Sequence, residues 1–97
     1  RRLSVVIPAH NEEGAIAPLV RETFAVLPPD LLGEVVVVDD ASRDGTAEAV
    51  RALMPAYAPR LRLIRHATRA GQSAAVRTGV AAARERLVGT MDGDGQN

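Results

Sequence analysis

The sequence predicts an α/β fold in which a parallel β-sheet carries helices on its faces, in the order βαβαβαβ. Short apolar runs rich in β-branched residues, above all Leu3–Pro8 and Glu34–Asp40, are nearly continuous instead of alternating. Continuous runs are typical of strands buried on both faces, as in a parallel sheet. Helix-like segments separate successive runs, and this alternation implies right-handed crossovers. With 97 residues, positions 1–97 are expected to form a single small domain.

The first helix is predicted between the first two of four strands. The four strands are expected at Leu3–Pro8, Glu34–Asp40, Leu61–Arg65 and Leu87–Met91. The first helix should run from Ala17 or Pro18 to Leu27. Proline is tolerated in the first turn of a helix, and Pro28-Pro29 ends the pattern.

Two further helices are predicted between the later strands. One begins at Asp44–Thr46, where the side chain of Asp44 or of Thr46 can cap it, and it stops before Pro55. The other begins near Gly71. Its apolar residues are Ala74, Ala75, Val76, Val80, Ala81 and Ala83. Side chains of this size suit a helix that lies close to a sheet.

Composition excludes several classes of function. The 12 basic residues, all arginine, balance 12 acidic residues, so no basic excess indicates a nucleic-acid partner. The absence of cysteine excludes disulfides and thiolate metal sites. No apolar run approaches the roughly 20 residues that span a bilayer, and no signal peptide is visible. Because the first residue is not methionine, we expect the chain to be a piece of a longer protein.

Polar residues follow three of the four predicted strands. These clusters are Pro8–Gly14, Asp39–Gly45 and Asp92–Gln96. In open parallel sheets, ligands bind beyond the carboxyl ends of the strands. The three clusters are therefore expected to converge on one edge of the sheet and to form a site there.

Each cluster alone also has a purely structural interpretation. Asp39–Ser42 fits turn and cap chemistry, and Asn11–Glu13 fits the positive end of a helix dipole. His10 alone is more typical of a loop residue than of a ligand. The stretch from Asp92 resembles the opening of a calcium loop, but Asn97 stands where that loop needs glycine.

Asp92 and Asp94 are separated by a single glycine, Gly93. Two carboxylates this close repel each other unless a positive charge lies between them. Oxygen ligands suit a hard cation such as Mg²⁺ or Mn²⁺, which leaves positions for phosphate oxygens. Neither Gly-x-Gly-x-x-Gly nor a Gly-Lys-Ser/Thr loop follows the first strand, which disfavours a dinucleotide-binding dehydrogenase and a P-loop NTPase.

Four motifs together resemble a family-2, GT-A-type glycosyltransferase. They read VVIPAHNEE at 5–13, VVVDDASRDGT at 36–46, GQSAA at 71–75 and TMDGDGQN at 90–97. The order and spacing cover nearly the whole chain and are most similar to the polyprenyl-phosphate hexosyltransferase branch, which includes dolichol-phosphate mannose synthases. The resemblance implies the Rossmann-like nucleotide-binding half of an inverting, metal-dependent transferase.

The resemblance also implies roles for individual residues. The positions expected to hold the nucleotide-sugar are Pro8, His10, Glu12, Val38, Asp40, Asp92, Gly93 and Gln96. Asp92 and Asp94 match the metal-binding Asp-x-Asp pair, with Mg²⁺ or Mn²⁺ as the cofactor. The donor would be a GDP- or UDP-hexose and the acceptor a polyprenyl phosphate at the cytoplasmic face of the membrane. The catalytic base is expected beyond Asn97, so residues 1–97 alone should not catalyse transfer.

Two positions depart from the family pattern, and two other classes of protein compete with it. Ala41 stands where the family often has glycine, and Arg69 where asparagine is common; Arg69 is either a phosphate contact or a surface charge. A receiver domain would explain the acidic strand end but needs a lysine, which the chain lacks. A nucleotidyltransferase would show a basic, glycine-rich loop where Pro8–Gly14 is acidic. Because the chain is short, we expect an edge strand or a helix face to be left uncovered, and therefore self-association into a homo-oligomer.

Overall fold

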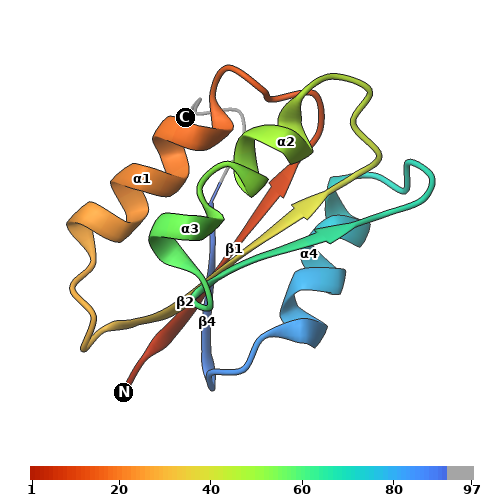
Figure 1. Ribbon diagram of the computed structural model, residues 1–97. Helices are drawn as coiled ribbons and strands as arrows, with labels where there is room; N and C mark the ends of the chain where they lie inside the picture. Colours follow the sequence, from red (N-terminus) through yellow and green to blue (C-terminus); the bar gives the residue numbers. More distant parts are fainter. Residues whose placement is uncertain (92–97) are drawn as a thin grey trace.

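The chain folds around a four-stranded parallel sheet, seen in a computed structural model that describes residues 1–91 (Figure 1). The strands are β1 (Leu3–Ala9), β2 (Leu32–Asp39), β3 (Leu61–Arg65) and β4 (Leu87–Thr90), and their order across the sheet is β3-β2-β1-β4. β1 therefore lies inside the sheet between β2 and β4. The predicted α/β class is confirmed.

Helices cover both faces of the sheet. They are α1 (Ile16–Val26), α2 (Thr46–Arg51), α3 (Met54–Tyr57) and α4 (Gln72–Ala82). Figure 1 shows α1, α2 and α3 on one face and α4 on the other. No helix within residues 1–91 is long and apolar enough to cross a membrane.

The core explains why the strands are continuously apolar. Alternate residues of β1 and β2, such as Ile7 and Val37, pack with α1, α2 and the turn after α2. The intervening residues, such as Val6 and Val36, pack with Ala75 of α4. Successive side chains of a strand point to opposite faces, so a sheet covered on both faces needs apolar residues at every position.

The predicted second helix differs from the structure. The helix expected from Asp44–Thr46 up to Pro55 is two helices: α2 ends at Arg51, and the single turn α3 begins at Met54 with Pro55 in its first turn. Proline has no N–H to donate and its ring clashes with the preceding turn, but it fits at the start of a helix. Pro55 therefore begins a new helix besides ending the old one.

The only two aromatic side chains, Phe24 of α1 and Tyr57 of α3, stack on each other. Their ring centroids are 4.3 Å apart and their planes differ by 8°. The guanidinium of Arg60 lies 5.2 Å from the centre of the Phe24 ring. Aromatic pairs and cation–π contacts each contribute about 1 kcal/mol, so this group ties α3 to α1.

A buried carboxylate, Glu34, fastens the amino-terminal edge of the sheet. Its oxygens accept hydrogen bonds from the Ser4 hydroxyl at 2.7 Å, from Arg62 Nη1 at 2.8 Å and from the Arg84 amide at 2.7 Å. Arg62 also donates to the carbonyl of Ala82 at the end of α4, at 2.9 Å. Burial by itself would raise the pKa of Glu34, but these hydrogen bonds and the charge of Arg62 outweigh it and lower the pKa below 4.5.

Glu34 should therefore make stability depend on pH in the acid range. Because its pKa is lower in the folded state, its contribution is complete above the ordinary value of 4.5 and disappears as the pH falls through the folded value. We expect Glu34→Gln to be less stable than wild type at about pH 7, and this difference to shrink as the pH falls to about 3. Urea unfolding at several pH values measures it.

Glu48→Gln is the matched control for this prediction. Glu48 pairs with Arg51 at 3.1 Å, but the side chains are 69% and 52% exposed. Exposed pairs contribute about 0–1 kcal/mol, so this variant should follow wild type at every pH. A gap between wild type and Glu34→Gln that stays constant down to about pH 3 would contradict the assignment.

Candidate functional site

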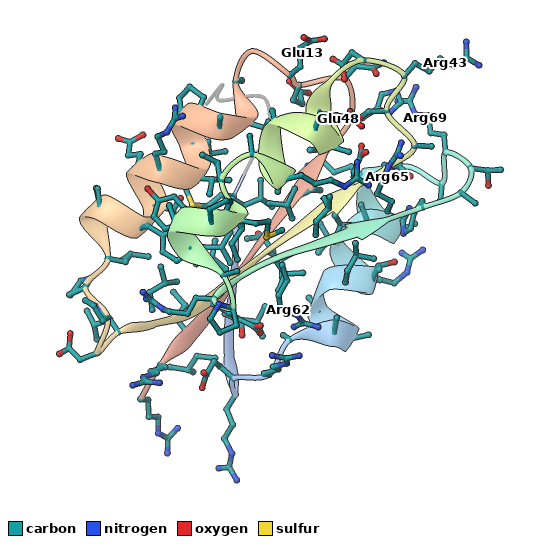
Figure 2. All side chains as sticks on the ribbon, viewed as in Figure 1. Glu13, Arg43, Glu48, Arg62, Arg65 and Arg69 are labelled. Carbon is teal, nitrogen blue, oxygen red and sulfur yellow. The ribbon has the colours of Figure 1, made fainter. Side chains whose placement is uncertain are left out.

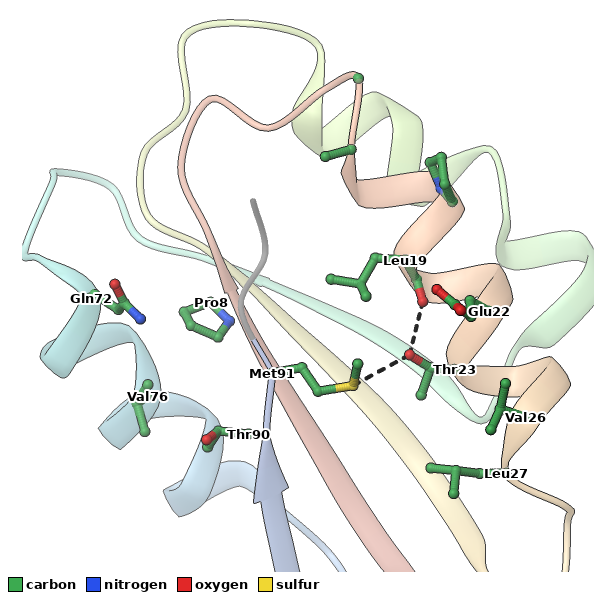
Figure 3. Close-up of a pocket in the computed structure, with 13 residues that line it drawn as sticks. Pro8, Leu19, Glu22, Thr23, Val26, Leu27, Gln72, Val76, Thr90 and Met91 are labelled. Carbon is green, nitrogen blue, oxygen red and sulfur yellow. Dashed lines mark hydrogen bonds between the residues drawn. The ribbon is translucent and has the colours of Figure 1, made fainter. Parts of the chain in front are cut away.

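A crevice lies where the chain reverses its direction across the sheet. β2 and β3 follow on one side of β1, whereas β4 lies on its other side. In open parallel sheets, ligands bind at this switch point, outside the carboxyl ends of the strands. A hollow of about 1070 Å³ occupies this place between α1 and α4, and Pro8, Thr90 and Met91 line it beside residues of both helices (Figure 3).

The walls of this crevice are mainly apolar. Leu19 and Val26 of α1 face Val76 of α4 across the opening (Figure 3). The Thr23 hydroxyl donates to the Leu19 carbonyl at 2.8 Å and contacts Met91 Sδ at 3.6 Å, so it has its partners within the wall. Val26 is 68% exposed. The crevice is thus an open, apolar slot.

The last described residue, Met91, lines the crevice. Met91 extends β4, and its amide donates to the Val6 carbonyl of β1 at 3.0 Å. Asp92 follows Met91 directly in the sequence. Asp92, Gly93, Asp94 and Gln96 lie outside the described residues, and their predicted roles stay predictions.

Hydrogen bonds join the loops after β1 and β2 beyond the carboxyl ends of these strands. The Asn11 amide donates to the Ser42 hydroxyl at 2.8 Å, and Asn11 Oδ1 accepts from the Arg43 amide at 2.9 Å. The Glu12 amide donates to Thr46 Oγ1 at 2.8 Å. These reciprocal bonds give the two loops a fixed shape without a ligand.

The carboxylates of Glu13 and Asp44 also accept hydrogen bonds between these two loops. The Glu13 amide donates to Asp44 Oδ2 at 3.3 Å, and the Gly45 amide donates to Glu13 Oε1 at 3.1 Å. Burial would raise the pKa of Asp44, but the Thr46 hydroxyl and nearby amides outweigh it and lower the pKa. In residues 1–91, no group of three or more acidic or histidine side chains is placed to hold a metal ion.

The paired acids at the end of β2 are held separately. Asp39 is buried and accepts from Arg65 Nε at 2.9 Å and from the Ser42 amide at 3.1 Å. Asp40 accepts from three donors, each at 2.8 Å: His66 Nδ1, the Ala70 amide and the Gly71 amide. Both carboxylates are therefore bound by the protein itself.

Asp40 stays ionised because of these donors. Burial would raise the pKa of its carboxyl, but the hydrogen bond from His66 and those from the two amides outweigh burial and lower the pKa. Its side chain is only 4% exposed. An ionised, nearly buried carboxylate draws the loop between β3 and α4 onto the end of β2.

The other predicted donor-binding residues are distributed around this edge. Pro8 lines the crevice. His10 is half-buried and donates from Nδ1 to the Asp40 carbonyl at 2.7 Å. Glu12 lies in the loop after β1, where its amide donates to Thr46. Val38 is fully buried in the core beneath α4 and in the central strand β2, so in this structure it exposes no surface to a ligand.

A second hollow, which the sequence did not indicate, lies beside the end of β3. Its volume is about 650 Å³, and its lining includes His10, Arg43, Arg65, His66 and Arg69. Figure 2 shows Arg43, Arg65 and Arg69 at the same end of the molecule, opposite Arg62. In the described part of the chain, neither Arg43 nor Arg69 forms an ion pair, so the hollow carries a positive charge.

Two residues of these loops have left-handed backbone conformations. The φ angle of Asn11 is 53° and that of Ala41 is 55°. Asn adopts this region readily, whereas alanine has to be held there by its surroundings. This conformation explains why the family pattern noted in the sequence has glycine at position 41, because glycine adopts a positive φ without strain.

The structure is an α/β domain with a crevice at the switch point of its parallel sheet, and comparison with known proteins identifies the family. The model of glycosyl transferase family 2 matches residues 4–97. The chain belongs to this family.

Two curated relatives match nearly the whole chain. A dodecaprenyl-phosphate galacturonate synthase of Rhizobium johnstonii is 40% identical over 98% of the chain and 28% of its own length. An undecaprenyl-phosphate 4-deoxy-4-formamido-L-arabinose transferase of Pseudomonas aeruginosa is 38% identical over 98% of the chain and 28% of its own length. The chain thus spans about a quarter of the curated relatives that it matches.

A solved structure shares both the fold and the sequence pattern. It is the mannosyltransferase PcManGT of Pyrobaculum calidifontis, in complex with GDP-Man and Mn²⁺. The TM-score is 0.85 and the identity 34%, over 95% of this chain and 27% of the other. The α/β architecture described above is therefore that of a glycosyltransferase.

Proposed function

We propose that the full-length protein transfers a hexose from a GDP- or UDP-hexose to a polyprenyl phosphate. The observation that carries the proposal is the crevice at the β1/β4 switch point, whose lining includes Met91, the residue before Asp92 in the sequence. The similarity to two transferases named for polyprenyl-phosphate acceptors supports the acceptor class. The similarity to a mannosyltransferase bound to GDP-Man supports the donor class.

In this proposal, residues 1–97 supply donor binding. The hydrogen-bonded loops after β1 and β2 form a rigid edge, so these loops need little further ordering when a donor binds. Pro8, His10, Glu12 and Asp40 face the nucleoside, Val38 supports them from the core, and Gly93 and Gln96 face the diphosphate or the sugar. The base that activates the acceptor lies in the part of the protein beyond Asn97.

A divalent cation fits the residues after β4. Two carboxylates two positions apart provide the hard oxygen ligands that Mg²⁺ and Mn²⁺ take, and in the sequence they follow β4, whose last residue, Thr90, lines the crevice. Asp92 and Asp94 would hold the ion. When bound, the ion supplies Lewis-acid neutralisation of the departing nucleoside diphosphate. A polyprenyl acceptor lies in a membrane, and we place the reaction at its cytoplasmic face.

The proposal is tested on the full-length protein with defined donors and a lipid acceptor. GDP-mannose, UDP-glucose and UDP-galacturonate, each labelled in the sugar, are incubated with undecaprenyl phosphate and Mn²⁺. We expect label in the lipid fraction from one donor, its loss with EDTA and its return with excess Mn²⁺. Absence of both transfer and binding heat with every donor of the panel would contradict the proposal.

A further inference from the structure

A histidine that no sequence motif indicated joins the acidic end of β2 to the helix α4. His66 Nδ1 donates to Asp40 Oδ1 at 2.8 Å, and His66 Nε2 lies 2.8 Å from the hydroxyl of Thr78 in the middle of α4. The His66 side chain is 17% exposed. With an ionised Asp40 as acceptor, Nδ1 carries the proton, and in the neutral ring Nε2 accepts from Thr78.

The loop between β3 and α4 depends on few anchors. At its start the His66 amide donates to the Asp39 carbonyl at 2.9 Å, and at its end the amides of Ala70 and Gly71 donate to Asp40. Within residues 1–91, no hydrogen bond holds residues 67–69 between these anchors. The shape of the loop therefore follows the position of the Asp40 carboxylate.

The position of this loop bounds both hollows of the site. Its residues His66 and Arg69 line the basic hollow beside β3. Its last residue, Gly71, has a φ of 100°, a conformation that favours glycine, and it directs the first turn of α4. Gln72 in that turn lines the crevice at the switch point (Figure 3). A shift of Asp40 would move the boundaries of both hollows.

We propose that His66 is a positioning residue for the donor: it orients the Asp40 carboxylate and thereby holds the β3–α4 loop as a preformed wall of the donor site. This inference rests on the proposed function. A hydrogen bond to an ionised, buried acceptor is among the stronger ones, and its loss leaves the carboxylate with one donor fewer. The wall would then have to be ordered by the donor itself, at the expense of affinity.

The test compares variants of His66 in the full-length enzyme. An asparagine amide can take the place of Nδ1 and a glutamine amide that of Nε2, so His66→Asn keeps the bond to Asp40, whereas His66→Gln keeps only the contact with Thr78. We expect His66→Ala and His66→Gln to raise the KM for the nucleotide-sugar about tenfold with kcat changed less than about threefold. His66→Asn should stay within about threefold of wild type.

Ser4→Ala is the control for a general loss of stability. Ser4 donates to Glu34 at the opposite edge of the sheet, so its removal weakens the fold away from the donor site. It should lower the melting temperature and leave the KM unchanged. An equal rise of the KM in Ser4→Ala, or an unchanged KM in His66→Gln, overturns the positioning role.

Hydrogen exchange gives a measurement that does not depend on catalysis. In His66→Gln the amides of Ala70 and Gly71 should exchange faster, while the Asp40 amide, which donates to the Ala9 carbonyl at 2.8 Å, should keep its protection. Unchanged exchange at Ala70 and Gly71 overturns the inference, whichever nucleotide-sugar the enzyme uses. A wild type that transfers no sugar overturns the proposed function instead, so the two failures are distinguishable.

Discussion

Asp94→Asn in the full-length protein should abolish metal-dependent sugar transfer, lowering kcat/KM by roughly a thousandfold or more, while the fold persists. The substitution removes one of the two adjacent carboxylates that we assign to the cation, and it changes neither the size of the side chain nor any residue of the described core. A turn without function predicts the opposite result, which is full activity. Transfer measured across a range of Mn²⁺ concentrations separates the two.

Ligand-dependent melting provides the second measurement for the Asp94 variant. A ligand that binds only the native state raises the melting temperature, and the stabilisation grows with the logarithm of the ligand concentration above Kd. Wild type should be stabilised by Mn²⁺ and further by Mn²⁺ with nucleoside diphosphate, and Asp94→Asn should lose most of both shifts. Asp30→Asn, an exposed acid in the turn before β2, is the matched control and should behave as wild type. Equal Mn²⁺-dependent turnover in wild type and Asp94→Asn would refute the metal site.

The fold could be predicted because the central strands β1 and β2 carry apolar residues on both faces over most of their length. Runs such as Val35–Val38 leave no polar face, which requires helices on both sides of the sheet and therefore a parallel arrangement. Boundaries were less accurate. β2 begins at Leu32, two residues before the predicted Glu34, because Leu32 is itself a buried core residue. Proline at position 55 was correctly predicted to end one helix, but its role in starting α3 was missed.

The site was predictable in its location and only partly in its chemistry. The expected convergence of polar loops is confirmed for the ends of β1 and β2 by the bonds between Asn11, Ser42 and Arg43. The buried acids Asp39 and Asp40, however, accept hydrogen bonds from amides and from Arg65 within the protein, because buried carboxylates need donors. The role of His66 had no signal in the sequence, since a single histidine after a strand acquires meaning only when Asp40 and Thr78 are placed around it.

Gly79→Ala should lower the free energy of unfolding by about 1–3 kcal/mol, although alanine is the better helix former by about 1 kcal/mol. Gly79 lies in α4 where the helix meets the sheet, and it is buried. A Cβ atom there would overlap Val6 Cγ1, and it would lie 3.1 Å from Val6 Cγ2 and 3.2 Å from Val38 Cγ2. These atoms belong to the central strands β1 and β2, which cannot move aside without disturbing the core on the other face of the sheet.

A double-mutant cycle with Val6→Ala tests this explanation of the Gly79 effect. Val6→Ala removes the two methyl groups that the new Cβ would meet, so Gly79→Ala should cost little stability in that background, and the two changes should be strongly non-additive. Gly14→Ala is the matched control, because a Cβ at Gly14 meets no atom within 4 Å. Urea unfolding of the four proteins of the cycle gives the coupling energy. Additive losses, or a Gly79→Ala variant as stable as wild type, would show that α4 can lift from the sheet. In that case the crevice wall formed by Gln72 and Val76 of α4 would be movable.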